Sequence, residues 1–151
     1  MRSRADGVQC GLGAGLASRF AARQLLFAHA ALTDLAGRRL RHAERIARWN
    51  GDTAAPRAAA SMADTRIHIG DWRFAREGAT YRAELGDEAA GFAYRLILAP
   101  TQPVLLQGEA GFSRKGPGRT HASHYVSEPQ LAVSGELLHQ GRRQTVRGTA
   151  W

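Results

Sequence analysis

From Arg66 to the end of the chain, apolar and polar residues alternate in short runs separated by turn residues. Alternation with a period of two places every second side chain on one face of an extended chain, so each run predicts a half-buried β-strand. The alternating residues are Ile67, Ile69, Trp72 and Phe74, then Tyr81, Ala83 and Leu85, then Phe92, Tyr94, Leu96 and Leu98, and finally Leu131, Val133, Gly135 and Leu137. Short strands at such spacing predict an all-β, antiparallel barrel or sandwich.

Glycine and proline mark the expected turns between these runs. They occur at Glu77-Gly78, at Gly86-Asp87, between Pro100 and Pro103, and at Gln140-Gly141. Inside the first run, Gly70 and Asp71 shift the phase of the alternation, as a β-bulge would.

The segment 18–48 is ambiguous from its residues alone. Its content of Ala, Leu, Arg and Glu favours two helices by intrinsic propensity. Its apolar block from Leu25 to Leu32, followed by Thr33, Asp34 and Gly37, fits equally well a buried strand that turns into a second strand.

Two other segments show no sustained apolar face. Residues 1–17 are rich in glycine, which raises the entropic cost of ordering them, so we expect a disordered leader. Residues 49–65 contain Asn-Gly, a proline and several alanines, and we expect a connecting loop there.

Composition limits the classes of protein to consider. With 151 residues and 44% apolar content the chain can build one compact core. The lone Cys10 excludes an internal disulfide, and no apolar run approaches the roughly twenty residues that a membrane-spanning helix needs. The net charge of +8 comes without basic clusters interleaved with aromatic residues, so we expect no nucleic-acid partner. No export signal is visible in the sequence.

A Gly-rich loop from Gly111 to Gly118 holds Ser113, Arg114 and Lys115. Its backbone N–H groups and adjacent cations could cradle an anion. It lacks the order of residues of a phosphate-binding loop, and a turn with solvated cations explains it equally well.

Other candidate residues stand alone. His29 lies inside the apolar block, where we expect a core histidine with a hydrogen-bond partner. Ser113 and Ser123 lack the context of a hydrolase nucleophile, whereas Tyr125 and Trp151 suit the wall of a pocket. The histidines lack the spacing of metal ligands, so we expect neither a metal nor a cofactor.

Three stretches together resemble the AttH-like/carotenoid 1,2-hydratase family. They are SRFAARQLLFAHAALTD with the following GRRLRHAERIAR, then GDWRF, and then the blocks from PVLLQGEAGFSRKGPG to GRRQTVRGTAW. Members are bacterial lipocalin-like proteins with two related antiparallel barrel domains. The resemblance implies that residues 18–151 form part of the first domain, with strands even in 20–48, and that a second barrel is a partner absent here.

The resemblance implies a domain that binds a hydrophobic small molecule such as a polyprenoid, carotenoid or lipid. Some members are lyases that add water to a terminal alkene of acyclic carotenoids; the alternative is a non-catalytic envelope component of a transport system of the AttH type. The implied compartment is the bacterial periplasm or cell envelope.

Residues matching the family's polar positions are the candidates for a site. His29 and Asp34 are candidate acid or base groups, and the candidate ligand-binding residues are Ser113, Arg114, Lys115, Ser123, Tyr125 and Trp151. We expect Arg114 and Lys115 to lie at the mouth of a barrel, where their charges would attract an anionic head group.

The sequence departs from the family pattern at both ends. The first residues do not match the family's aromatic-rich initial strand, which would leave the next strand with an open edge. The family's acidic DHEW-like run does not follow the TAW motif at Thr149 to Trp151. We therefore expect an incomplete domain that alone is inactive as an enzyme.

Overall fold

The computed structural model describes residues 2–11, 24–49, 56–61, 63–118 and 121–151, and this part of the chain forms strands without any helix. Every pair of neighbouring strands is antiparallel, which confirms the predicted all-β antiparallel class. The described residues accordingly include no helix that could cross a membrane. The strands are β1 (Arg2–Gly11), β2 (Gln24–Asp34), β3 (Arg39–Trp49), β4 (Ala58–Ala60), β5 (Arg66–Ile69), β6 (Trp72–Glu77), β7 (Thr80–Asp87), β8 (Phe92–Pro100), β9 (Leu105–Leu106), β10 (Phe112–Arg114), β11 (Ala122–His124), β12 (Val126–Ser127), β13 (Leu131–His139) and β14 (Arg142–Ala150).

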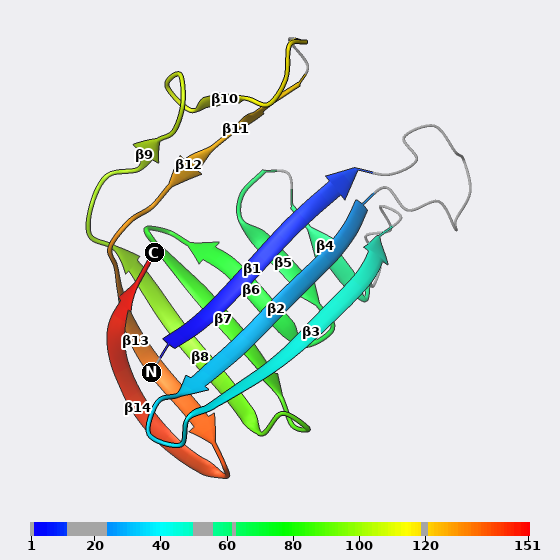
Figure 1. Ribbon diagram of the computed structural model, residues 1–151. Coiled ribbons are helices and arrows are strands. Elements are labelled where there is room, and N and C mark those ends of the chain that lie inside the picture. Colours follow the sequence, from blue (N-terminus) through cyan, green and yellow to red (C-terminus); the bar gives the residue numbers. More distant parts are fainter. Residues whose placement is uncertain (1, 12–23, 50–55, 62, 119–120) are drawn as a thin grey trace.

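Two sheets form the body of the protein. Seven strands make a curved sheet in the order β14-β13-β8-β7-β6-β5-β4, and β1-β2-β3 make a second sheet that crosses over its concave face (Figure 1). No strand of one sheet pairs with a strand of the other among the described residues. The architecture is therefore an open sandwich and not a closed barrel.

The core lies between the two sheets. Ala30 and Leu32 of β2 are buried against the inner face of the larger sheet, whose contributions are Trp72, Ala83, Leu85, Phe92, Tyr94, Leu96 and Leu137. These are the apolar positions of the alternating pattern, as the sequence predicts. The indole Nε1 of Trp72 donates a hydrogen bond to the Gly86 carbonyl at 2.6 Å, so the one polar atom of this large buried side chain is satisfied.

One predicted bulge and one predicted turn need correction. Gly70 and Asp71 are not a bulge but the tight turn of the β5–β6 hairpin, in which Ile69 pairs with Trp72 and Gly70 has a φ of 62°. Such a two-residue turn needs positive φ, and it keeps the paired residues on the same face. The turn predicted at Gly86-Asp87 lies further along the chain. Both residues belong to β7, and the chain reverses between Asp87 and Phe92, where Gly91 has a φ of 72°.

The segment before Arg66 contains more strand than its residues indicate. Residues 2–11, expected in a disordered leader, form β1 and pair along the length of β2, so β2 has no open edge. Residues 1 and 12–17 lie outside the described residues. The strands implied by the resemblance are confirmed as β2 and β3. In the expected connecting loop, Ala58 and Ala60 of β4 are buried with Leu26 and Ile69 in a second apolar cluster.

Two inward-facing arginines of β3 link the sheets. The Arg45 guanidinium lies 4.9 Å from the centre of the Trp72 ring and pairs with Asp71 in the β5–β6 turn. Nη1 of Arg41 donates to the Ala90 carbonyl in the β7–β8 turn at 3.0 Å. These contacts join two sheets that share no backbone ladder among the described residues.

A narrow ribbon, here called the arm, leaves the sandwich between β8 and β13 and extends away from it (Figure 1). It spans residues 104–130 and contains two short ladders, β9 with β12 and β10 with β11. Backbone hydrogen bonds from Gln107 to Tyr125 and from Tyr125 to Gly111 connect the two ladders. The described residues of the arm thus form a two-stranded structure with no second layer of strands over it.

Candidate functional site at the open end of the sandwich

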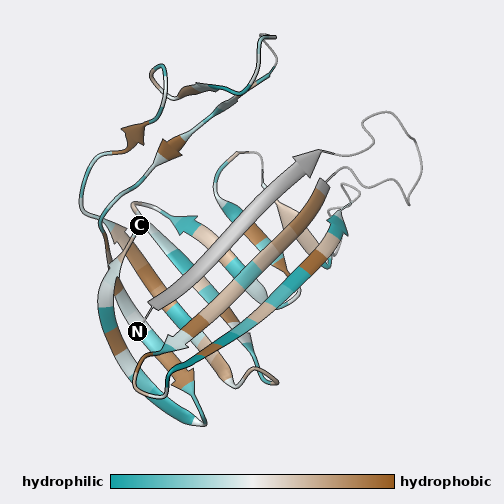
Figure 2. Cartoon of the chain, viewed as in Figure 1, coloured by the Kyte–Doolittle hydropathy of each residue, from teal (hydrophilic) through white to brown (hydrophobic). Residues whose placement is uncertain are grey.

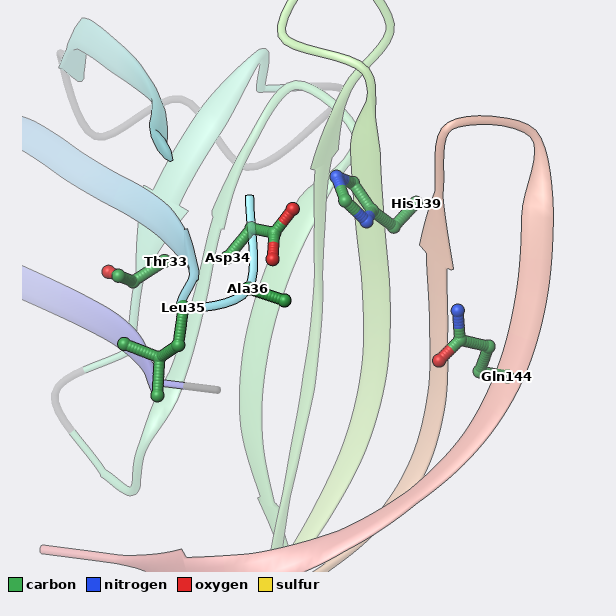
Figure 3. A pocket seen from close by; sticks show the side chains of 6 residues that line it. All are labelled: Thr33, Asp34, Leu35, Ala36, His139 and Gln144. Atoms are coloured by element: carbon green, nitrogen blue, oxygen red, sulfur yellow. The ribbon is translucent and has the colours of Figure 1, made fainter. Parts of the chain in front are cut away.

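A pocket of about 280 Å³ lies where the β2–β3 turn faces the β13–β14 hairpin. Figure 3 shows its lining, with one group of side chains from the turn and another from the hairpin. The lining residues are Thr33, Asp34, Leu35, Ala36, His139 and Gln144. The site lies at an end of the core, where the two sheets separate.

The turn holds the Asp34 carboxylate in place. Oδ1 of Asp34 accepts a hydrogen bond from the backbone N–H of Gly37 at 2.9 Å. A Cβ at position 37 would collide with the Asp34 carboxylate, so a larger residue there would displace this side chain. This carboxylate is therefore part of the turn as well as part of the pocket wall.

His139 and Gln144 come from the hairpin on the other side. His139 ends β13 in register with Phe92 and follows the inward phase of Leu131 and Leu137. Its Nε2 is buried without a hydrogen-bond partner among the described residues. A buried polar atom without a partner costs about 1–3 kcal/mol.

Two more buried polar atoms in the sandwich have no hydrogen-bond partner in the part of the chain that the structure describes. They are the Tyr94 hydroxyl and Nε of Arg41. Burial raises the pKa of Tyr94 to about 12. Its phenol therefore stays protonated at neutral pH and can donate as well as accept a hydrogen bond. Tyr94 pairs with Leu137, next to the pair of Phe92 with His139.

The structure separates the two candidate acid or base groups. Asp34 lines the pocket, but His29 lies on the outer face of β2, where its side chain is 55% exposed and its Nε2 is 3.7 Å from the Glu44 carboxylate. The expectation of a core histidine is therefore wrong. The phase of the strand explains the error, because Ala30 and Leu32 point inward and the residue before Ala30 must point outward.

The candidate ligand-binding residues of the Gly-rich loop gather on the arm and not at the pocket. Ser113 pairs with Ser123 between β10 and β11, and Arg114 is the next residue of β10. Nζ of Lys115 lies 5.9 Å from the centre of the Tyr125 ring. The sixth candidate, Trp151, follows β14 and is 86% exposed. The structure thus brings five of the six together, away from the apolar core.

The sequence did not point to His139 or Gln144. For His139 a signal was present, since continuing the alternation of Leu131, Val133, Gly135 and Leu137 by one step places it on the inner face. Gln144 could be found only from the register of the hairpin, which pairs it with Leu137.

The pocket combines a carboxylate, an imidazole and a carboxamide at the edge of an apolar interior. Hydrogen-bonding groups beside apolar walls suit the polar end of an amphiphilic molecule. No three side chains of His, Cys, Asp or Glu come together as a metal site in the part of the chain that the structure describes.

Comparison with known proteins supports a single family. The model of the AttH-like family matches residues 7–151. A crystal structure of a protein assigned to AttH, from Nitrosomonas europaea, superposes with a TM-score of 0.79 at 41% identity over 97% of this chain. The chain spans 42% of the length of that relative. Among curated proteins, none matches the sequence.

Proposed function

The chain belongs to the AttH-like family, and from that premise we propose that it is a binding domain for a hydrophobic small molecule with one polar end. The observation that carries the proposal is the pocket beside the apolar core, whose wall includes His139, a residue with a buried Nε2 that has no hydrogen-bond partner among the described residues. A hydroxyl or carboxyl group of a ligand would supply the missing hydrogen bond. Asp34 and Gln144 would orient that polar end.

The size of the pocket limits what it can enclose. Its volume of about 280 Å³ is at the small end of ligand sites, which usually measure about 300–1,000 Å³. It can therefore hold the polar end of a lipid or polyprenoid and a short apolar segment. The remaining chain of a long ligand would extend along the surface or between the sheets.

A domain that only binds its ligand and a hydratase that converts it would need different chemistry in the pocket. A hydratase of the carotenoid type would use a pocket acid to protonate a terminal alkene, and Asp34 is the pocket's carboxyl group. Asp34 already accepts a hydrogen bond that shapes the turn, which favours a structural role. We therefore propose that this chain binds the ligand without converting it. The alternative to a hydratase-related domain is a non-catalytic envelope component of a transport system.

A fluorescent fatty acid such as cis-parinaric acid tests the binding proposal. We expect saturable binding to the chain, and we expect Gln144→Phe to weaken it at least about tenfold because the new ring fills the pocket. Thr145→Phe is the matched control, since this neighbour lies on the opposite face of β14 and is also exposed. Equal affinity of the Gln144→Phe variant and the wild type would overturn the proposal.

An assay with an acyclic carotenoid separates the two forms of the function. We expect no hydration product from this chain, whereas turnover that is lost in Asp34→Asn would establish the hydratase form. The Asn side chain keeps an oxygen for the Gly37 N–H, so the turn remains and the acid is removed.

A further inference from the structure

A second pocket lies on the outer face of the larger sheet, over β5, β6 and β7. Trp72, Ala83 and Leu85 point into the core, so the residues that alternate with them point to the other side of the sheet. Figure 2 shows this alternation of hydrophobic and hydrophilic residues along the strands. The pocket has a volume of about 490 Å³, and its charged lining residues are Arg66, Arg73, Arg76, Arg82, Glu77 and Glu84.

A small residue lies between the arginines of this pocket. Ala75 of β6 pairs with Arg66 of β5 on one side and with Arg82 of β7 on the other. Neighbouring strands are about 4.8 Å apart, so these two long side chains leave the sheet on either side of a single methyl group. Arg73 and Glu77 lie two residues before and after Ala75, on the same face of β6. We call the space above Ala75, bordered by Arg66, Arg73 and Arg82, the outer recess.

The three arginines of the outer recess have donor groups that are free to bind a ligand. Arg66 and Arg73 are exposed, and their side chains form no hydrogen bond or ion pair in the part of the chain that the structure describes. Nε of Arg82 donates a hydrogen bond to Oε2 of Glu77 at 3.1 Å. The two Nη groups of Arg82 have no partner among the described residues, so donors from three strands converge on the recess.

The margin of the pocket has a different character. Arg76 is already engaged, since its Nε donates to the Gly78 carbonyl at 3.2 Å and its Nη1 lies 3.9 Å from Oδ1 of Asp64. Glu84 pairs with Arg73 in the β6–β7 ladder, but their side chains form no ion pair within the described ranges. A carboxylate in this position can accept hydrogen bonds from hydroxyl groups. The pocket therefore has donors at its centre and an acceptor at its margin.

This arrangement of donors fits a phosphate group better than a carboxylate. Guanidinium groups bind phosphate through paired, charge-assisted hydrogen bonds. The oxygens of a phosphate point in different directions and can meet donors that come from three strands, whereas one guanidinium can satisfy both oxygens of a planar carboxylate. The volume of about 490 Å³ lies within the usual range for ligand sites and leaves room for the group that carries the phosphate.

We propose that the outer recess binds the phosphate of an ester whose remaining part carries hydroxyl groups, such as glycerol phosphate or the phosphoglycerol headgroup of a lipid. The three arginines bind the phosphate, and Glu84 accepts hydrogen bonds from the hydroxyl groups. The recess is separate from the pocket that contains Asp34 and His139. The inference therefore does not depend on the ligand-binding proposal made for that pocket.

Calorimetry with glycerol phosphate at low ionic strength tests the role of the arginines. We expect saturable one-to-one binding, and we expect the double variant Arg66→Gln, Arg73→Gln to weaken it at least about tenfold because two charged donors are lost. The matched control is Arg95→Gln, Arg147→Gln. It removes the same charge from two exposed arginines on the same face of the sheet, outside the pocket. We expect the control to change the affinity by less than about twofold.

A second variant tests the recess without a change of charge. Ala75→Leu fills the space between the arginines, and we expect it to weaken the binding of glycerol phosphate at least about tenfold. Ala132→Leu is the matched control, since it makes the same substitution at an outward position of β13 that does not line the pocket. Thermal unfolding of both variants checks that the sheet is intact. Unchanged affinity in a folded Ala75→Leu variant would overturn the proposal.

Vesicles distinguish the two sources of the phosphate. Sedimentation with phosphatidylglycerol vesicles but not with phosphatidylcholine vesicles, reduced in the double variant of Arg66 and Arg73 and retained in its control, would support a lipid headgroup. Binding of glycerol phosphate without sedimentation would support a free ester. The proposal would be overturned by absence of binding in both assays or by equal losses in the two double variants. Equal affinity for methyl phosphate and glycerol phosphate would overturn the proposed class of ligand.

Discussion

The sandwich and the arm have the same antiparallel strand pairing but bury their apolar side chains to different extents. In the sandwich the two sheets face each other, so inward residues such as Leu32 and Trp72 are almost completely buried. In the arm no second layer is present over the described ladders, and Leu106 and Val126 are about half exposed. Backbone pairing alone therefore does not make a core. A two-stranded ribbon needs an external surface to bury its side chains.

The largest expected effect is in the sandwich. Trp72→Ala removes a buried indole, its hydrogen bond to Gly86 and its contact with Arg45. We expect the free energy of unfolding to fall by about 3–5 kcal/mol. Leu106→Ala in the arm should change it by no more than about 0.5 kcal/mol. Urea denaturation of both variants measures the difference, and similar losses would remove the distinction between the two regions.

Glycine substitutions are expected to affect the sandwich and the arm differently. At Gly135, in β13, φ is 151° and an added Cβ would collide with the Arg95 carbonyl oxygen. At Gly108, in the arm, φ is 62° and the Cβ would lie 2.5 Å from the Phe112 carbonyl oxygen. We expect Gly135→Ala to lower the free energy of unfolding by about 1–3 kcal/mol. Gly108→Ala should distort only the arm, which amide chemical shifts would reveal without a change in melting temperature.

Alkaline pH should destabilise the sandwich through Tyr94. Burial raises the pKa of this phenol to about 12, from an ordinary value of 10.0 in the unfolded chain. The stability that it contributes is complete below pH 10 and is lost as the pH rises to 12, because the unfolded chain releases its proton first. We expect a loss of roughly 2 kcal/mol by pH 12. In Tyr94→Phe the unfolding curves at pH 9 and pH 11.5 should differ less, and an unchanged pH dependence would contradict this.

A smaller effect is expected where β3 meets the larger sheet. Arg45→Ala removes the contact with the Trp72 ring and the ion pair with Asp71, and we expect a loss of about 1 kcal/mol. The exposed Asp71 adds little, since surface ion pairs contribute about 0–1 kcal/mol. A double-mutant cycle of Arg45→Ala with Trp72→Phe measures the coupling, and independent effects would exclude a direct contact.

Much of the fold follows from the sequence, because burial on one face requires alternation. The inward phase of β5 to β8 and β13 is visible in residues such as Ile69, Phe92 and Leu137. Strand β4 could not be found this way, because it is only three residues long and its buried side chains are alanines. Strand β1 has no alternation of apolar and polar residues, so its sequence does not indicate a strand. The structure reveals it through its pairing with β2.

The site was harder to predict than the fold. Asp34 was identified through the resemblance, but the residues that face it come from a hairpin about a hundred positions later. Only the packing of the two sheets against each other brings His139 near the β2–β3 turn. The Gly-rich loop was singled out for its composition, which does not reveal that the loop lies on an arm outside the core.

Native-state hydrogen exchange on the isolated chain tests most directly whether the sandwich and the arm are separate units. The amides between β8 and β13 should exchange only through global unfolding, whereas those between β10 and β11 should exchange through local opening with a much smaller free energy. Equal exchange free energies in the two ladders, both matching global unfolding, would contradict the account. The arm would then be an integral part of the cooperative core.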